Sequence, residues 1–354
     1  MVKYFCLFVF VFLFSSCIEA KEKLQSYSAD DDRLQYVGRI DFSNKLKPRM
    51  WATAAGVGFS FKGTTCKVIV SDEELYGKSH NYIDIVVDGQ YNRIQLSSKT
   101  DTLVVALNLK DTVHQVSITK STEAGIGYIE FDAFLCEELV PTSTALTRKI
   151  ESFGDSITSG MGNDTSSVGC HRGDWYDQTN GYRTYAAITG RALNAQHHLT
   201  SVSGIGMIHS CCDMDVLMPQ VFDKISLRDN KLAWDFTRYQ PDVVTICLGQ
   251  NDGVQDSARF CNAYINLVQQ LRTHYPKATI ICLSSPMADP TLLKAMKKYL
   301  TAVRDYFFEA GDKNVYRYYF TKQSIAGCDS HPSMSEHEQI ASELTAYIKS
   351  VKNW

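Results

Sequence analysis

The spacing of apolar residues changes near residue 140, and this change constrains the fold more than any other feature of the sequence. From residue 34 to residue 139, short alternating or apolar runs are separated by polar or glycine turns, which is the pattern of an all-β sandwich. No helix of useful length is expected in this half. The expected strands are 55–61, 66–71, 82–87, 102–107, 114–119 and 130–135.

After residue 141 the pattern alternates short apolar strands with helical segments. This alternation predicts a parallel sheet with helices on both faces. We therefore expect a β-sandwich domain at 30–142 and an α/β domain at 146–354, joined by a short Pro-Thr-Ser-Thr linker. The expected strands are 149–153, 198–202, 242–248, 279–283 and 315–319, and the expected helices are 182–193, 216–223, 258–274, 291–309 and 333–349.

The first twenty residues have the pattern of an export signal. Lys3 supplies a positive charge, and an apolar run follows at 4–14 that is too short to span a bilayer. The Phe-Ser-Ser-Cys segment ending at Cys17 resembles a bacterial lipoprotein box, which would attach the chain to a membrane through a lipid; the alternative is cleavage after Ala20. Both alternatives predict an exported bacterial protein that is periplasmic, a cell-surface lipoprotein or secreted.

The charge balance argues against a nucleic-acid partner. The formal net charge is −3 and the isoelectric point is about 6.3, whereas nucleic acids and anionic membranes bind basic faces.

The cysteines divide into core and loop positions. Cys247 and Cys282 lie inside apolar strands and are expected in the core. No C-x-x-C pair is present, so a zinc ribbon is not expected. The loop cysteines could form a disulfide among themselves, although their spacing does not determine the pairing: Cys170, Cys211, Cys212 and Cys328.

Three polar motifs stand at the ends of expected strands, where ligands bind in open parallel sheets. A Gly-Asp-Ser turn ending at Ser156 presents a hydroxyl at the sheet edge, and a Gly-Gln-Asn-Asp turn presents the Asn251 amide, a good donor to an oxyanion. His331 stands just before the last helix, which Ser333 and Glu336 begin as a capping box. A histidine there can take the proton of the serine.

These motifs together resemble the SGNH/GDSL hydrolase superfamily. The second glycine of that family is best matched by Gly204, in the Ser-Gly-x-Gly segment after an expected strand. The resemblance implies a flavodoxin-like sheet, Ser156 as nucleophile, His331 as base, and an oxyanion hole made by Ser156, Gly204 and Asn251. The family places an aspartate three residues before the histidine, but here Asp329 lies two residues before it. Either Asp329 or a backbone carbonyl would then orient His331.

A β domain ahead of such a domain, with Gly-Cys-Asp-x-His-Pro near the end, narrows the resemblance to carbohydrate esterase family 2. That family removes acetyl groups from xylan and other polysaccharides. The resemblance implies a jelly-roll-like β domain and a serine esterase acting on an acetylated polysaccharide or oligosaccharide, without metal or organic cofactor. Trp175 and Tyr176 lie in a long loop and either stack on a sugar or pack the loop down. The alternatives are a lipase or thioesterase using the same site, and a non-catalytic glycan-binding lipoprotein.

Overall fold

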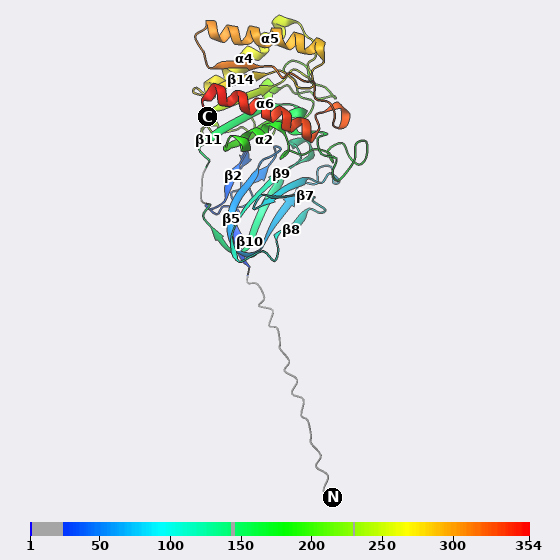
Figure 1. The fold of residues 1–354 in the computed structure, drawn as a ribbon, viewed down its shortest axis with the longest axis vertical. Coiled ribbons are helices and arrows are strands. Elements are labelled where there is room, and N and C mark those ends of the chain that lie inside the picture. Colours follow the sequence, from blue (N-terminus) through cyan, green and yellow to red (C-terminus); the bar gives the residue numbers. More distant parts are fainter. Residues whose placement is uncertain (2–23, 143–145, 229–230) are drawn as a thin grey trace.

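The structure is a computed structural model that describes residue 1 and the ranges 24–142, 146–228 and 231–354 (Figure 1). The expected signal peptide at 1–20, with Cys17 and Ala20, therefore lies outside the described residues apart from residue 1. None of the helices in these ranges combines the length and the apolar character that crossing a membrane requires.

The first half folds into ten antiparallel strands, seven of which follow the order β3-β4-β10-β5-β9-β6-β7. The other three pair with members of this series: β1 with β10, and β2 and β8 with β5. The long strand β5 joins them, because it pairs with β2, β8, β9 and β10. Aromatic and branched side chains such as Phe59 and Phe134 fill the interior. The strands are β1 (Gln25–Ser28), β2 (Gln35–Val37), β3 (Ile40–Asp41), β4 (Arg49–Met50), β5 (Gly56–Asp72), β6 (Tyr82–Val87), β7 (Gln90–Gln95), β8 (Thr100–Ala106), β9 (Thr112–Lys120) and β10 (Ile129–Val140).

The second half contains a parallel five-stranded sheet in the order β12-β11-β13-β14-β15. Helices α2 and α6 pack on one face of it, and α4 and α5 pack on the other (Figure 1). The strands are β11 (Arg148–Gly154), β12 (Ala195–Ser201), β13 (Val243–Cys247), β14 (Thr279–Leu283) and β15 (Val315–Tyr318). The helices are α1 (Ser156–Ser159), α2 (Tyr185–Ala192), α3 (Met218–Val221), α4 (Ser257–His274), α5 (Pro290–Glu309) and α6 (Met334–Lys352), with short 3-10 turns η1 (Ala124–Ile126), η2 (Phe236–Arg238) and η3 (Cys328–Ser330).

This strand order produces a crevice at one edge of the sheet. The chain runs from β11 outward to β12 and then returns to place β13 on the other side of β11. Connections therefore leave β11 and β13 in opposite directions, and ligands of open α/β sheets bind at such a point. The polar motifs after β11, β12 and β13 consequently meet at one place.

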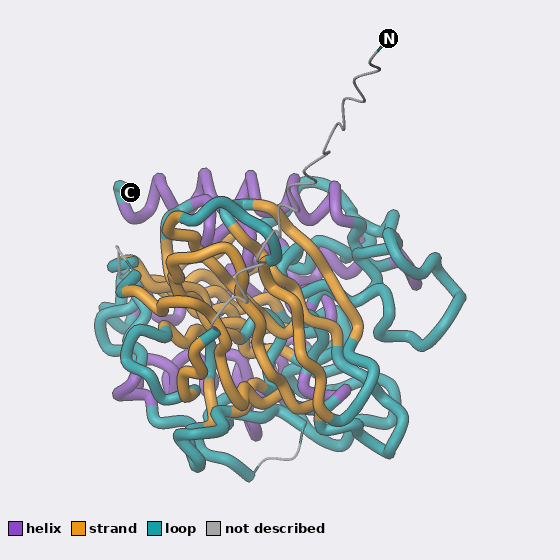
Figure 2. The backbone as a smooth tube through the Cα atoms, turned by 90° about the horizontal axis from the view of Figure 1, so that it is seen from below, coloured by secondary structure: helices purple, strands orange, loops and turns teal. Residues whose placement is uncertain are grey.

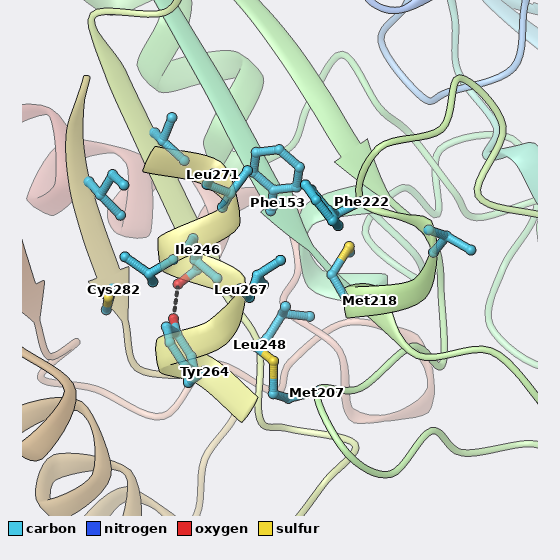
Figure 3. Packing of buried hydrophobic residues seen from close by; sticks show 14 of the residues in the cluster. Phe153, Met207, Met218, Phe222, Ile246, Leu248, Tyr264, Leu267, Leu271 and Cys282 are labelled. Carbon is cyan, nitrogen blue, oxygen red and sulfur yellow. Dashed lines mark hydrogen bonds between the residues drawn. The ribbon is translucent and has the colours of Figure 1, made fainter. Parts of the chain in front are cut away.

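A hydrophobic cluster supports this edge from below (Figure 3). Phe153 and Leu248, which immediately precede the polar turns after β11 and β13, are both fully buried in it. Tyr264 of α4 donates its hydroxyl to the Ile246 carbonyl at 3.1 Å, so helix and strand are also joined by a hydrogen bond (Figure 3). The polar turns thus start from rigid positions.

The two halves share a buried ion pair. Arg39 of the β domain places its Nε 2.9 Å from Glu151 Oε1 on β11, and both side chains are almost fully buried. The same guanidinium donates to the carbonyls of Phe222 and Lys224. This contact ties the β domain to the α/β domain, because removing one partner of a buried ion pair is strongly destabilising. Figure 2 shows the strands of the β domain in front of the α/β domain.

The predicted fold class is confirmed: an antiparallel β domain precedes a five-stranded parallel sheet with flanking helices. One prediction within the β domain is wrong. The strands expected at 55–61 and 66–71 are one continuous strand, β5, because β10 pairs with both parts across a register shift. The glycine turn between them, at Gly63, is absorbed by the strand with φ +136°.

Candidate active site

Ser156 stands at the sharp turn between β11 and α1. Gly154 is required there, because a Cβ at this position would overlap the Thr158 side chain. Asp155 caps α1 by accepting the N–H of Ile157 at 3.0 Å. Ser156 is the first residue of α1, so its own N–H has no acceptor within the helix. The turn therefore presents both the hydroxyl and the N–H of Ser156 at the sheet edge.

His331 lies against Ser156. Its Nε2 is 2.8 Å from Ser156 Oγ, and its Nδ1 is 3.0 Å from the backbone carbonyl oxygen of Asp329. A carbonyl oxygen only accepts, so the Nδ1 bond requires a proton on Nδ1 and leaves Nε2 free to accept the serine proton. Burial lowers the pKa of His331, which keeps the imidazole neutral near pH 7. The predicted capping box of Ser333 and Glu336 is confirmed. It fixes the start of α6, just after His331.

The Asp329 carboxylate does not take the orienting role that the resemblance offered as one alternative. It lies 3.6 Å from Nδ1 of His171 and its side chain is 55% exposed. The residue has φ 50° and ψ 40°, the left-handed region, and the backbone carbonyl of this turn meets the imidazole in place of the side chain. The structure thus shows the other alternative, a Ser–His pair with a backbone acceptor behind it.

This geometry predicts that Asp329→Asn leaves kcat on a small acetyl ester within about threefold of wild type. Asparagine tolerates the left-handed backbone and keeps the carbonyl in place. Removing a triad carboxylate typically costs about 10⁴ in kcat, so steady-state kinetics separate the two alternatives clearly. A loss greater than about 10² in a folded variant would restore the carboxylate as the orienting group.

Gly204 and Asn251 follow the neighbouring strands. Gly204 comes after β12 with φ +87°, and Asn251 comes after β13. The Asn251 Nδ2 donates to the Ile205 carbonyl at 2.9 Å, which joins the two turns, and its second N–H makes a long contact of 3.5 Å to Asp155 Oδ2 beside Ser156. Ser156, Gly204, Asn251 and His331 line one cleft of about 840 Å³.

Asp252 is a site residue that the sequence analysis missed. Its buried carboxylate accepts the backbone N–H groups of Met207, Ile208 and His209 at 2.7 to 3.1 Å, so it shapes the loop that carries Gly204. Burial raises the pKa of Asp252 while these hydrogen bonds oppose the rise. The only available signal was an aspartate directly after the asparagine, and that pattern is common in ordinary turns.

The two aromatic residues of the long loop have different surroundings. Trp175 lines the cleft and is 45% exposed, whereas Tyr176 is buried against Tyr82 and Ile126 and donates to Asp174. Tyr176 therefore packs the loop down, and its suggested substrate contact is wrong. Within the described ranges, no group of three or more His, Cys, Asp or Glu side chains is placed to hold a metal ion.

A disulfide joins this long loop to the loop of His331. Cys170 is bonded to Cys328, and the Cys328 N–H donates to the Gly162 carbonyl while its own carbonyl accepts from the His331 N–H. Cys211 and Cys212 also line the cleft but are free thiols. The predicted core positions of two further cysteines are confirmed, since both side chains are buried: Cys247 and Cys282.

We expect the double replacement Cys170→Ser/Cys328→Ser to lower the free energy of unfolding by about 2–4 kcal/mol. The bond closes a long loop, with a sequence separation of 158, and therefore restrains the unfolded chain. Denaturant unfolding of the oxidised protein and of the double variant measures the difference. Dithiothreitol should destabilise the wild type but not the variant; equal unfolding curves for both proteins would contradict the prediction.

A Ser–His pair at the crevice of a five-stranded α/β sheet is the arrangement of the GDSL class of hydrolases. The family model described as GDSL-like Lipase/Acylhydrolase matches residues 152–317, and the model described as Carbohydrate esterase 2 N-terminal matches residues 36–142. The chain belongs to carbohydrate esterase family 2.

Several relatives match this chain over most of its length. A family two carbohydrate esterase from Clostridium thermocellum, solved in complex with cellohexaose, is 32% identical with a TM-score of 0.83, and covers 91% of this chain and 99% of its own. The Cellulase/esterase CelE of Acetivibrio thermocellus is 33% identical over 94% of this chain, which spans 41% of that relative's length. An Acetylxylan esterase / glucomannan deacetylase of Cellvibrio japonicus is 24% identical, covering 97% of this chain and 96% of the relative.

Proposed function

We propose that this protein hydrolyses O-acetyl esters of a polysaccharide or oligosaccharide, with Ser156 as nucleophile and His331 as base. The observation that carries the proposal is the 2.8 Å contact between His331 Nε2 and Ser156 Oγ at the floor of an open cleft. A base within hydrogen-bond reach of a serine, itself oriented by a third group, is the geometry of an activated nucleophile.

The reaction proceeds by acyl transfer in two halves. Ser156 Oγ attacks the acetyl carbonyl as His331 Nε2 accepts its proton. The oxyanion receives hydrogen bonds from the N–H groups of Ser156 and Gly204 and from the Asn251 amide. The bond between the acyl carbon and the sugar oxygen then breaks as His331 gives the proton to that oxygen, so the sugar leaves with a free hydroxyl, and water repeats the sequence on the acetyl-enzyme.

The walls of the cleft favour a carbohydrate over a long acyl chain. Both domains contribute to it, and its aromatic residues Trp175 and Tyr76 are exposed, as rings that stack on sugars must be. Charged side chains also line it, including Glu123 and Arg228. Relatives named as acetylxylan esterases and glucomannan deacetylases support acetate as the acid that the reaction releases.

The test is acetate release from acetylated xylan and acetylated glucomannan, with p-nitrophenyl acetate and a long-chain p-nitrophenyl ester in parallel. Acetate release with weak long-chain activity supports the proposal. Preference for the long-chain ester would favour the lipase or thioesterase alternative. A folded protein that binds the polysaccharide but cleaves no ester would favour the non-catalytic glycan-binding alternative.

A further inference from the structure

The β domain reaches into the active site through a single carboxylate. Glu123 lies between β9 and η1 and is 2% exposed. Its Oε2 accepts both the backbone N–H and the hydroxyl of Ser203, each at 2.8 Å. Ser203 immediately precedes Gly204, so this contact lies one residue from a proposed oxyanion donor.

Three side chains from outside the loop that carries Gly204 bind its backbone. Glu123 holds its start at Ser203, Asn251 holds the Ile205 carbonyl, and Asp252 holds the three N–H groups that follow. The side chain of Met207 also packs into the hydrophobic cluster beneath the loop (Figure 3). Of the three side chains that bind the loop backbone, Glu123 alone comes from the β domain.

Gly204 depends on these contacts because glycine itself supplies no stiffness. Its φ of +87° lies in a region where only glycine moves freely, so the direction of its N–H is set by its neighbours. Binding the backbone and side chain of Ser203 to one carboxylate oxygen restrains that residue at two points. Losing both bonds removes the restraint on the Ser203 side of the peptide group that carries the Gly204 N–H, while the Gly204 carbonyl still accepts from the Cys211 N–H at 2.8 Å.

The surroundings of Glu123 indicate that its side chain does more than fill space in the interior. A buried carboxylate is costly, and Asp155 lies near enough to add repulsion. The buried ammonium of Lys120 offsets part of this cost and donates to the Glu123 carbonyl at 2.8 Å. An apolar side chain would fill the same space without that cost, but it could not bind Ser203.

We propose that Glu123 is a positioning residue for the esterase reaction: it holds Ser203 so that the Gly204 N–H points at the oxyanion. The inference rests on the proposed function of the site and extends it, because the β domain then completes the catalytic centre. The effect is specific to the transition state, since the oxyanion exists only there.

Kinetics of three variants on p-nitrophenyl acetate test this role. Glu123→Ala removes the acceptor, and we expect kcat to fall about 10–100-fold with KM within about threefold, the scale of a misplaced reacting group. Glu123→Gln keeps an acceptor oxygen, so kcat should recover to within about fivefold of wild type. Ser203→Ala loses only the hydroxyl bond, and in that background Glu123→Ala should cost less than it does alone.

Glu137 offers a matched control in the same domain. Its Oε1 accepts the backbone N–H of Thr64 at 2.7 Å and the Thr64 hydroxyl at 2.9 Å, the same pair of bonds at a distance from the cleft. Glu137→Ala should change thermal stability without changing kcat.

A folded Glu123→Ala variant with kcat within threefold of an active wild type would overturn this inference and leave the proposed function intact. An equal loss of kcat in Glu137→Ala would also overturn it, because the effect would then be general destabilisation. If Glu123→Ala does not fold, Ser203→Ala takes its place: a lower kcat with KM unchanged supports the role of Glu123, and a kcat equal to that of wild type overturns it. A wild type without esterase activity would remove the proposed function, and this inference with it.

Discussion

Ser156→Ala is expected to lower kcat on acetyl esters by about 10⁴–10⁶, the largest effect of any single replacement in the chain. The alanine has no nucleophile for His331 to activate, although the oxyanion donors and the cleft remain in place. Substrate binding should therefore persist, and isothermal titration of the variant with an acetylated oligosaccharide should still detect binding.

The same prediction extends to His331 because the two residues act as one unit. His331→Ala should be impaired to a similar degree, and the double variant should be no worse than either single variant. Ser152→Ala is the matched control, since Ser152 is a buried serine on β11, the strand that leads to Ser156, and accepts from Thr245 away from the cleft. Retention of more than a few per cent of activity in a folded Ser156→Ala variant would exclude Ser156 as nucleophile.

Outside the Ser156–His331 pair, Asn251→Ala carries the largest expected effect, a loss of about 10²–10³ in kcat with little change in KM. That is the usual result of removing one oxyanion donor, because the hydrogen bond strengthens only as charge develops. Asn251→Asp should lose at least as much, since a carboxylate of the same size offers an acceptor where a donor is needed.

The neighbouring residue provides the control for this measurement. Gln250 belongs to the same turn, but its Oε1 accepts from Ser285 at 2.6 Å and its side chain does not line the cleft. Gln250→Ala should therefore keep kcat within about threefold. A kcat for Asn251→Ala that matches that of Gln250→Ala would show that the Asn251 amide does not contact the oxyanion.

The sequence by itself determined those features that depend on local patterns. The spacing of apolar residues separated the β half from the α/β half, because strands and helices bury side chains with different periods. The positions of Ser156, Asn251 and His331 could be read because each directly follows a strand or precedes a capped helix. Parallel strands bring their carboxyl ends to one edge, so local signals far apart in the sequence indicated one site.

Tertiary structure alone decided how these groups are oriented and supported. The role of Asp329 depended on one left-handed backbone conformation, and sequence spacing allowed either its side chain or its carbonyl to meet His331. Trp175 and Tyr176 are adjacent in the chain, yet only Trp175 opens to the cleft. Which side of a loop faces a cleft depends on what packs beneath it, and no local pattern contains that information.

The supporting contacts were hidden for the same reason. Cys170 is bonded to Cys328 across a separation of 158 residues, and Glu123 of the β domain accepts a hydrogen bond from Ser203 of the α/β domain. Neither pairing is determined by the local sequence, because each depends on how segments far apart in the chain pack together. Local patterns therefore indicated the groups to which we assign the chemistry, whereas long-range packing decided which groups hold them in place.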